Sequence, residues 1–228
     1  MSIDSYRDRE HAGEVLGEAL RERGYAGRND VLVLALPRGG VPVAREVART
    51  LHAPLDVMLV RKLGVPGHEE LAMGAIASGG ARVLNEQVVE QFGITDETVA
   101  VVAAREGREL ARREQAYRGG RADPAAVGRC VVLVDDGLAT GSTMEAAVVA
   151  VRQRGPRELV VAVPVAPAET CRRLEQRVDA VVCPLTPADF AGVGQWYERF
   201  DQTTDEQVRG ILAEAWGEPR HEAERRWA

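Results

Sequence analysis

The stretch at residues 131–143 reads VVLVDDGLATGST in one-letter code. Its first four residues are apolar, and a continuous apolar run is typical of a strand buried on both faces of a parallel sheet. Two carboxylates, Asp135 and Asp136, come directly after that strand. Because open α/β sheets bind ligands in the loops at the carboxyl ends of their strands, we expect residues 135–143 to face a ligand.

Small residues dominate the loop that follows the two acids. Gly137 and Gly141 keep the backbone uncluttered. Ser142 and Thr143 add hydroxyl groups at the point where a helix is expected to begin. Main-chain N–H groups and hydroxyls at a helix N-terminus bind anions such as phosphate. The adjacent carboxylates repel a phosphate, so their partners are sugar hydroxyls, a cation or a developing positive charge. The loop therefore predicts a site for a phosphorylated sugar.

Two other interpretations of this loop explain less of it. A Walker A loop requires Gly-Lys-Ser/Thr, and the stretch has no lysine. A capping box between Ser142 and Glu145 would explain those two residues as the start of a helix. It leaves the acid pair and the other small residues unexplained, so we favour the ligand site.

The stretch 131–143 resembles the signature by which type I phosphoribosyltransferases bind phosphoribosyl pyrophosphate (PRPP). The resemblance implies a phosphoribosyltransferase in which Asp135 and Asp136 are the catalytic acids beside the ribose. It also implies the cofactor Mg²⁺, bound mainly through substrate oxygens because magnesium uses few protein carboxylates, with Asp135 and Asp136 as candidate ligands. The residues implied to anchor the 5-phosphate are Ala139, Thr140, Gly141, Ser142 and Thr143.

A second strand, loop and helix precede this unit in the chain. Residues 31–36 (VLVLAL) predict another buried strand, and Pro-Arg-Gly-Gly follows at 37–40. A flexible glycine backbone beside the fork-shaped cation of Arg38 suits pyrophosphate. The loop resembles the pyrophosphate loop of the family, which assigns Arg38, Gly39 and Gly40 to that group. A simple turn is the alternative.

Lys62 is the single lysine among 29 basic residues, all the others being arginine. A lone lysine can mark a site that needs a compact ammonium group. It follows a predicted strand at 56–60, whose end would lie near the first two loops. Family members commonly carry a basic residue here that contacts PRPP, so the resemblance implies a pyrophosphate contact. A solvated strand end is the alternative.

Aromatic residues gather in the segment 186–202, although the chain is only 4% aromatic. An aromatic ring in a loop at a sheet's end can stack on a planar acceptor while polar groups read its edge. Purine-specific members of the family use an aromatic residue at a comparable late position. The candidate acceptor-binding residues are Asp189, Phe190 and Trp196, with Phe190 the best stacking candidate. Ordinary packing over the end of the sheet is an equal alternative.

Two further segments could close over a substrate. Residues 64–77 combine a breaker-rich loop with a short strand at 71–77, and they are our candidate for part of the mobile lid that the resemblance implies. Residues 95–118 predict a long polar helix with charges spaced for pairing along it, typical of a solvated face. Its basic end, which includes Arg112, Arg113 and Arg118, adjoins a Gly-Gly hinge and could alternatively be an arm over an anionic substrate.

Strands and helices alternate along the chain. This alternation predicts an α/β fold with a doubly wound, mainly parallel sheet flanked by helices. We expect one domain over residues 1–216, with a small hood around 186–202 and a polar tail at 217–228. The further predicted strands are 159–163 and 180–183, and the further predicted helices are 5–23, 43–51, 168–177 and 205–215.

Composition argues against nucleic-acid and membrane partners. A net charge of −6 argues against a nucleic-acid partner. The chain has no apolar run of membrane-spanning length, and its first residues are too charged for a secretory signal, so we expect no membrane partner. Three widely spaced cysteines predict reduced core residues of a cytoplasmic protein. A homodimer is an expectation from the family alone.

The predicted function is transfer of the 5-phosphoribosyl group of PRPP to an acceptor, most simply a nucleobase, with release of pyrophosphate. One alternative is a non-catalytic regulatory protein of the same fold that senses PRPP or a nucleotide. Another is an unrelated doubly wound phosphate binder such as a phosphosugar isomerase. The sequence does not separate a purine acceptor from a pyrimidine or from a less usual nucleophile.

Overall fold

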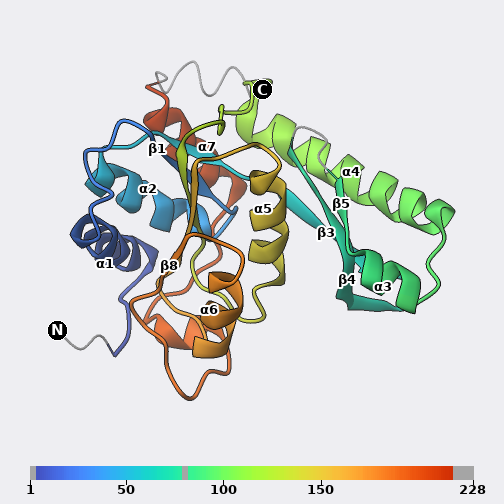
Figure 1. The fold of residues 1–228 in the computed structure, drawn as a ribbon. Helices are drawn as coiled ribbons and strands as arrows, with labels where there is room; N and C mark the ends of the chain where they lie inside the picture. The colour runs from blue at the N-terminus through green and yellow to red at the C-terminus, as the bar shows by residue number, and fades with distance from the viewer. Residues whose placement is uncertain (1–3, 79–81, 218–228) are drawn as a thin grey trace.

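The computed structural model describes residues 4–78 and 82–217, and its centre is a five-stranded sheet (Figure 1). The strands lie in the order β2-β1-β6-β7-β8, and each neighbouring pair is parallel. They are β1 (Val31–Ala35), β2 (Leu55–Val57), β6 (Cys130–Val134), β7 (Glu158–Ala162) and β8 (Ala180–Val182). The predicted α/β fold with a mainly parallel sheet is confirmed.

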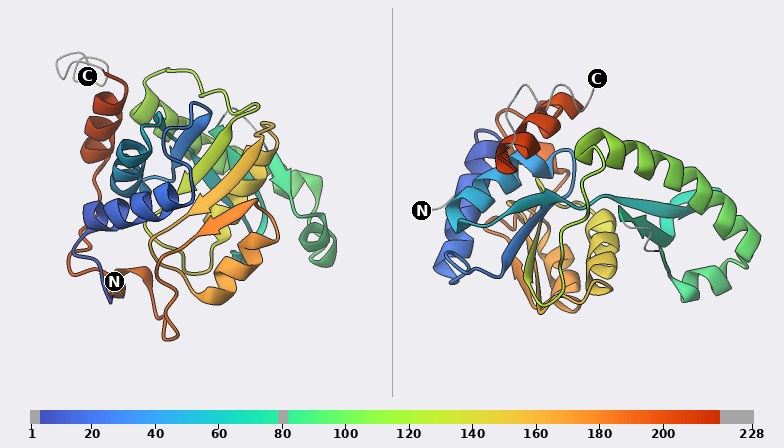
Figure 2. Two further views of the ribbon diagram at one scale, coloured as in Figure 1. Left: turned by 60° about the vertical axis from the view of Figure 1, so that its left-hand side comes forward. Right: turned by 90° about the horizontal axis from the view of Figure 1, so that it is seen from above.

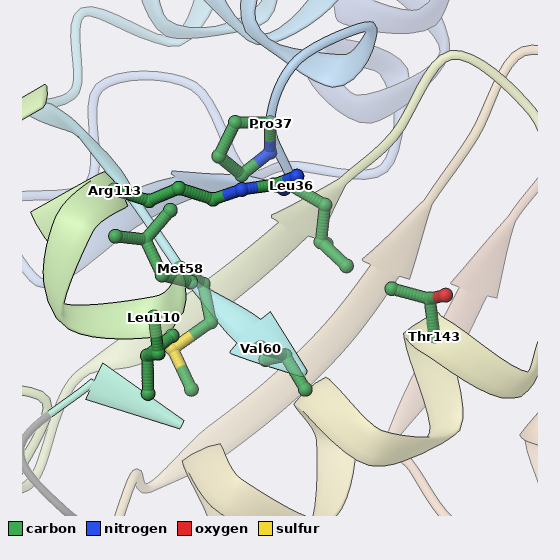
Figure 3. Close-up of a pocket in the computed structure, with 8 residues that line it drawn as sticks. Leu36, Pro37, Met58, Val60, Leu110, Arg113 and Thr143 are labelled. Atoms are coloured by element: carbon green, nitrogen blue, oxygen red, sulfur yellow. The ribbon is translucent and has the colours of Figure 1, made fainter. Parts of the chain in front are cut away.

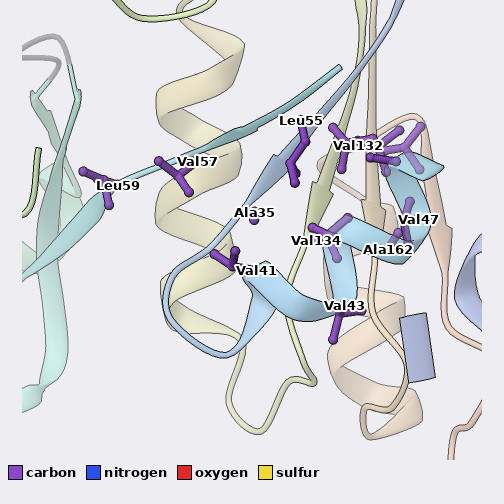
Figure 4. Packing of buried hydrophobic residues seen from close by; sticks show 14 of the residues in the cluster. Ala35, Val41, Val43, Val47, Leu55, Val57, Leu59, Val132, Val134 and Ala162 are labelled. Atoms are coloured by element: carbon purple, nitrogen blue, oxygen red, sulfur yellow. The ribbon is translucent and has the colours of Figure 1, made fainter. Parts of the chain in front are cut away.

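Helices cover both faces of this sheet. Successive residues of a strand point to opposite faces, so Val31 and Val33 join one core cluster while Leu32 and Leu34 join another. Figure 4 shows the first cluster, in which β1, β2 and β6 pack against α2. The helices of the body are α1 (Arg9–Glu22), α2 (Gly40–Leu51), α5 (Ser142–Arg152), α6 (Ala168–Glu175) and α7 (Asp205–Ala215). Because both faces are covered, the free carboxyl edge of the sheet is where loops can form a site.

A second, antiparallel sheet extends from one side of the body and was not predicted (Figure 2). It consists of β3 (Val60–Val65), β4 (His68–Ala77) and β5 (Arg82–Leu84), and it carries α3 (Glu86–Gln91) and α4 (Asp96–Arg118). The predicted strand at 71–77 is the second half of β4. The breaker-rich loop before it is only a tight turn, in which Gly67 has a φ of +80°. The proposed lid segment 64–77 is thus mostly a β-hairpin, and its motion stays a prediction.

The predicted strand at 56–60 is wrong, because it divides between the two sheets. Asp56 and Val57 belong to β2, whereas Val60 begins β3. On the outer edge of β2, the Val57 N–H donates to the Asp56 carboxylate at 2.7 Å and the Val57 carbonyl accepts from Arg118 at 2.8 Å. Side chains thus replace a further strand at this edge, and the chain is free to leave for the second sheet.

The segment 186–202 is largely loop and contains one short 3-10 helix, η2 (Val193–Trp196). An isolated bridge joins it to the N-terminal segment at Tyr6–Tyr197, and a second pairs Leu185, just before the segment, with Val165 after β7. The single-domain division and the hood stay predictions. Apart from Gly217, the predicted polar tail lies outside the described residues. Within the described ranges, no helix combines the length and the apolar character needed to cross a membrane.

Candidate active site

Two loops meet at the carboxyl edge of the central sheet, one after β1 and one after β6. The two strands are direct neighbours, with Ala35 paired to Val134. A Cβ atom added to Gly39 would lie 2.6 Å from Cγ of Asp136, and one added to Gly40 would lie 2.7 Å from the Val134 carbonyl oxygen. Only glycine leaves room for this approach. The glycine loop therefore lies at the same sheet edge as the acid pair, as predicted, and the structure also brings the two into direct contact.

Asp136 is held by residues that sequence reasoning missed. Its Oδ2 atom accepts a hydrogen bond from Nε of Arg9 at 2.8 Å. The Arg9 guanidinium also lies 3.9 Å from the ring centroid of Phe200. The carbonyl of Asp136 accepts from the Tyr197 hydroxyl at 2.5 Å. Arg9 lies 127 residues before Asp136, so no local pattern could have revealed the pair.

The two acids do not behave as exposed carboxylates. Burial raises the pKa of Asp135 well above its usual range, and the charge of neighbouring Asp136 raises it further. Burial also raises the pKa of Asp136, while the Arg9 guanidinium opposes that shift. Asp135 accepts the backbone N–H of Asp136 at 2.9 Å, which fixes its orientation. The pair is thus set for contacts with polar groups of a ligand rather than with bulk water.

The loop 139–143 leads into α5 with Gly141 in the left-handed conformation, at φ +75°. The hydroxyls of Thr140 and Ser142 lie 2.8 Å apart, and no side chain caps the helix. The capping box is therefore wrong. Its Glu145 instead accepts a hydrogen bond from Nε of Arg173 at 2.6 Å, which draws that carboxylate toward α6.

Residues of α6 hold the backbone of this loop. The Thr170 hydroxyl donates to the carbonyl of Ala139 at 3.0 Å, and Arg173 donates to the carbonyl of Thr140. Both contacts use main-chain carbonyls and leave the start of α5 at the sheet edge. The side chains of residues 139, 140 and 143 are exposed there. The arrangement suits an anion at the helix N-terminus.

The predicted pyrophosphate residues occupy two different elements. Arg38 follows a cis peptide bond after Pro37, and its guanidinium lies 3.5 Å from Oδ1 of Asp205. The sequence predicted that Lys62 follows a strand of the parallel sheet, and this is wrong. Lys62 lies within β3, where it pairs with Ala75. The reason is that the segment 56–60 divides between β2 and β3, so the chain has already entered the antiparallel sheet at Lys62. The glycine loop therefore lies at the acid pair, while Lys62 belongs to the adjoining antiparallel sheet.

A small cavity lies between the two loops and α4 (Figure 3). Pro37 of the glycine loop and Thr143 of α5 border it, and Arg113 reaches toward it from α4. The sequence favoured a solvated helix face for Arg113, with an arm over an anionic substrate as the alternative. The residues that line the cavity are Leu36, Pro37, Met58, Leu59, Val60, Leu110, Arg113 and Thr143.

Comparisons with known proteins agree with this geometry. The family model described as "Phosphoribosyl transferase domain" matches residues 2–198. The chain belongs to the phosphoribosyltransferase family. The resemblance of residues 131–143 to that family is thereby confirmed.

Individual relatives within this family cover most of the chain. Two proteins of Mycobacterium tuberculosis strains, each named "putative phosphoribosyl transferase", are 46% identical over 210 residues, which is 92% of this chain. The chain spans about half the length of these curated relatives, 47% of each. The crystal structure of TT1426 from Thermus thermophilus is 49% identical, with a TM-score of 0.84, and the match covers 92% of this chain and 98% of that one.

The predicted acceptor residues lie in the segment over the sheet edge. Phe190 and Trp196 pack against a cluster that includes Tyr6 and Tyr197. Asp189 is exposed, and its carbonyl accepts a hydrogen bond from Gln195 at 3.1 Å. The indole N–H of Trp196 is buried without a partner among the described residues. The packing alternative therefore accounts for where the two rings lie, and acceptor contact stays a prediction.

The acid pair offers few protein ligands for a metal ion. Among the described residues, no group of three or more His, Cys, Asp or Glu side chains could hold a metal ion. Asp135 and Asp136 can supply at most two carboxylates, and Arg9 already contacts one of them. A magnesium ion here would need further oxygen ligands, which a phosphorylated substrate carries.

Proposed function

We propose that the protein transfers the 5-phosphoribosyl group of PRPP to a nucleobase and releases pyrophosphate. The observation that carries this proposal is the contact between the glycine loop and the acid pair, in which Gly39 lies directly against Asp136. That contact puts a candidate pyrophosphate site beside a candidate ribose site on adjacent strands. PRPP is a substrate that needs both, whereas a simple sugar phosphate needs only one.

The substrate's charged groups have separate candidate partners. The loop from Ala139 to Thr143, at the start of α5, would anchor the 5-phosphate. Arg38, with the Gly39–Gly40 backbone and Lys62, would hold the pyrophosphate. A guanidinium matches the geometry of phosphate oxygens, and glycine lets the backbone come close. The two charged ends of PRPP would then fix the furanose ring against the acids.

The acid pair would act on the sugar. In the reaction the anomeric carbon loses its bond to the pyrophosphate oxygen and gains a bond to a ring nitrogen of the acceptor, which gives up a proton. The breaking bond leaves the ribosyl group with oxocarbenium character. Asp135 and Asp136 would bind the ribose hydroxyls and stabilise that positive charge. Alignment of the acceptor and charge stabilisation are sufficient means of catalysis, and no covalent enzyme intermediate is needed.

The remaining parts of the proposal concern the cofactor, the acceptor, the cellular location and the partners. Mg²⁺, when bound, would neutralise charge on the pyrophosphate leaving group, held by substrate oxygens with Asp135 and Asp136 as candidate protein ligands. Asp189, Phe190 and Trp196 are the candidate acceptor contacts. We further propose that the protein is cytoplasmic and acts on small-molecule substrates, without a nucleic-acid or membrane partner. A homodimer is proposed from the resemblance to the family alone.

Release of pyrophosphate from PRPP tests the proposal. The purified protein is incubated with PRPP, Mg²⁺ and a panel of purines and pyrimidines, and pyrophosphate is measured with each acceptor. We expect release that depends on one acceptor or one class of acceptor. Binding of PRPP without release for any nucleobase would favour the regulatory alternative. Equal affinity for ribose 5-phosphate and PRPP would favour an unrelated phosphosugar binder.

A further inference from the structure

The cavity of Figure 3 lies where the candidate phosphate and pyrophosphate sites adjoin. Pro37, at the start of the glycine loop, forms one border, and Thr143, in the first turn of α5, forms another. Met58, in the link between β2 and β3, and Val60, the first residue of β3, also line the cavity. A group bound here would touch both loops at once.

The cavity has a mostly apolar lining with one cationic side chain. Of the described residues that line it, Arg113 alone carries a charge, and none is a carboxylate. The cavity has a volume of about 20 Å³, which is room for a group about the size of a water molecule. One phosphoryl oxygen beside a guanidinium fits both the charge and the size.

Arg113 is held in place on α4. Its Nε atom donates to Oε1 of Glu109 at 2.8 Å, and its side chain extends from the helix toward Leu36 and Pro37 (Figure 3). Hydrogen bonds from Arg112 and Arg113 lower the pKa of Glu109 to about 2, so the carboxylate that holds Arg113 stays charged at neutral pH. A guanidinium has further N–H donors in a fixed fork beyond the one at Nε. The fork is thus oriented before any ligand arrives.

The same helix is tied to the glycine loop one turn further on. Tyr117 lies four residues after Arg113, on the same side of α4. Its hydroxyl donates to Oδ1 of Asp205 at 2.6 Å, and that oxygen also lies 3.5 Å from Arg38. Arg113 and Arg38 are therefore brought to the same loop by a continuous set of contacts.

We propose that Arg113 is a further pyrophosphate-binding residue, which contacts the leaving group from α4 while Arg38 and Lys62 contact it from the other elements. This inference rests on the proposed function. It gives the three arginines at the basic end of α4 different roles. Arg118 is buried and pairs with Asp56, and Arg112 is largely exposed. Arg113 is the member of this group that borders the cavity.

The substitution Arg113→Gln tests the inference, with Arg112→Gln as its matched control. Both arginines belong to α4 and both bond Glu109, but only Arg113 lines the cavity. Each variant and the wild-type protein are titrated by calorimetry with PRPP, with inorganic pyrophosphate and with ribose 5-phosphate. We expect Arg113→Gln to weaken PRPP and pyrophosphate binding by about 10- to 100-fold, the usual effect of losing hydrogen bonds to a charged group. Ribose 5-phosphate should bind within about 2-fold of wild type, because it lacks the leaving group.

Further outcomes separate this inference from the proposed function. We expect Arg112→Gln to match wild type for all three ligands and Arg113→Lys, which keeps the charge but loses the fork, to fall between wild type and Arg113→Gln. Unchanged pyrophosphate binding in Arg113→Gln, or an equal loss for ribose 5-phosphate, would overturn the inference while leaving the proposed function standing. If Arg113→Gln fails to fold, wild-type affinity for pyrophosphate in Arg113→Lys would overturn the inference. A wild-type protein that binds neither PRPP nor pyrophosphate would overturn both.

Discussion

The substitution Gly39→Ala should disrupt the site by adding a single methyl group. Gly39 precedes α2 with φ −60° and ψ −34°, a conformation that alanine adopts without strain. Any effect must therefore come from contact. The added Cβ would lie 2.6 Å from Cγ of Asp136, whereas ordinary contacts begin at 3.4 Å. The carboxyl group, which also bonds Arg9 at 2.8 Å, would have to move.

The expected magnitude follows from that displacement. A shift of about 1 Å in a reacting group can lower turnover by on the order of 100-fold. An extra methyl group in a packed region destabilises by about 1–3 kcal/mol. We therefore expect Gly39→Ala to remain folded, with a lower melting temperature, and to lose most of its pyrophosphate release. PRPP binding should weaken as well, because the glycine loop and the acids would no longer fit together.

A matched glycine isolates the effect of the contact. Gly210 lies within α7, and a Cβ added there meets no heavy atom within 4 Å among the described residues. Gly210→Ala should leave activity unchanged and stabilise the protein by about 0.5–1 kcal/mol, because alanine favours the helix. The assays are thermal unfolding and pyrophosphate release with the acceptor that the screen selects. Turnover within about threefold of wild type in Gly39→Ala would refute the reasoning, since a displaced carboxylate cannot leave an acid-dependent step intact.

Three further predictions concern single side chains. Asp136→Asn should lower turnover by on the order of 100-fold while circular dichroism stays as in wild type, because a neutral amide cannot stabilise the ribosyl cation; unchanged turnover would contradict the role of the acids. Lys62→Met should weaken PRPP binding by on the order of 10-fold and ribose 5-phosphate binding much less, and equal losses by calorimetry would count against a pyrophosphate contact. Arg118→Met should destabilise by about 3–5 kcal/mol in denaturant unfolding, because it leaves the buried Asp56 carboxylate without its partner 3.0 Å away. Adding Asp56→Leu should recover part of that loss, and no recovery would contradict this explanation.

Elements with a strong local pattern could be predicted from the sequence. The helix at 205–215 agrees with α7 at both ends, and the apolar run at 131–134 is β6 apart from one residue. Each has its apolar residues at a clear period and a change of composition at its boundary. The shared sheet edge of the glycine loop and the acids also followed from sequence, because the parallel strands before them were recognisable and such loops open at one edge. Their direct contact did not follow from sequence.

Features set by distant residues could not be predicted in this way. The strand at 56–60 reads as one apolar run, yet Arg118, 61 residues further on, occupies the edge of β2 at Val57. The partner of Asp136 is Arg9, in a helix whose sequence gives no sign of it. The capping box failed because Gly141, not Ser142, is the N-cap of α5, and because Glu145 bonds Arg173 from another helix. In each case a tertiary ion pair or hydrogen bond overrides the local preference.

The central claim is that the glycine loop and the acid pair form one site for both ends of PRPP. Calorimetric titration of the wild-type protein with PRPP and with ribose 5-phosphate, each with Mg²⁺, tests it most directly. We expect saturable binding of both ligands, with PRPP at least about 10-fold tighter because only PRPP carries the pyrophosphate group that this site would hold. Equal affinities, or no heat on adding PRPP, would contradict it.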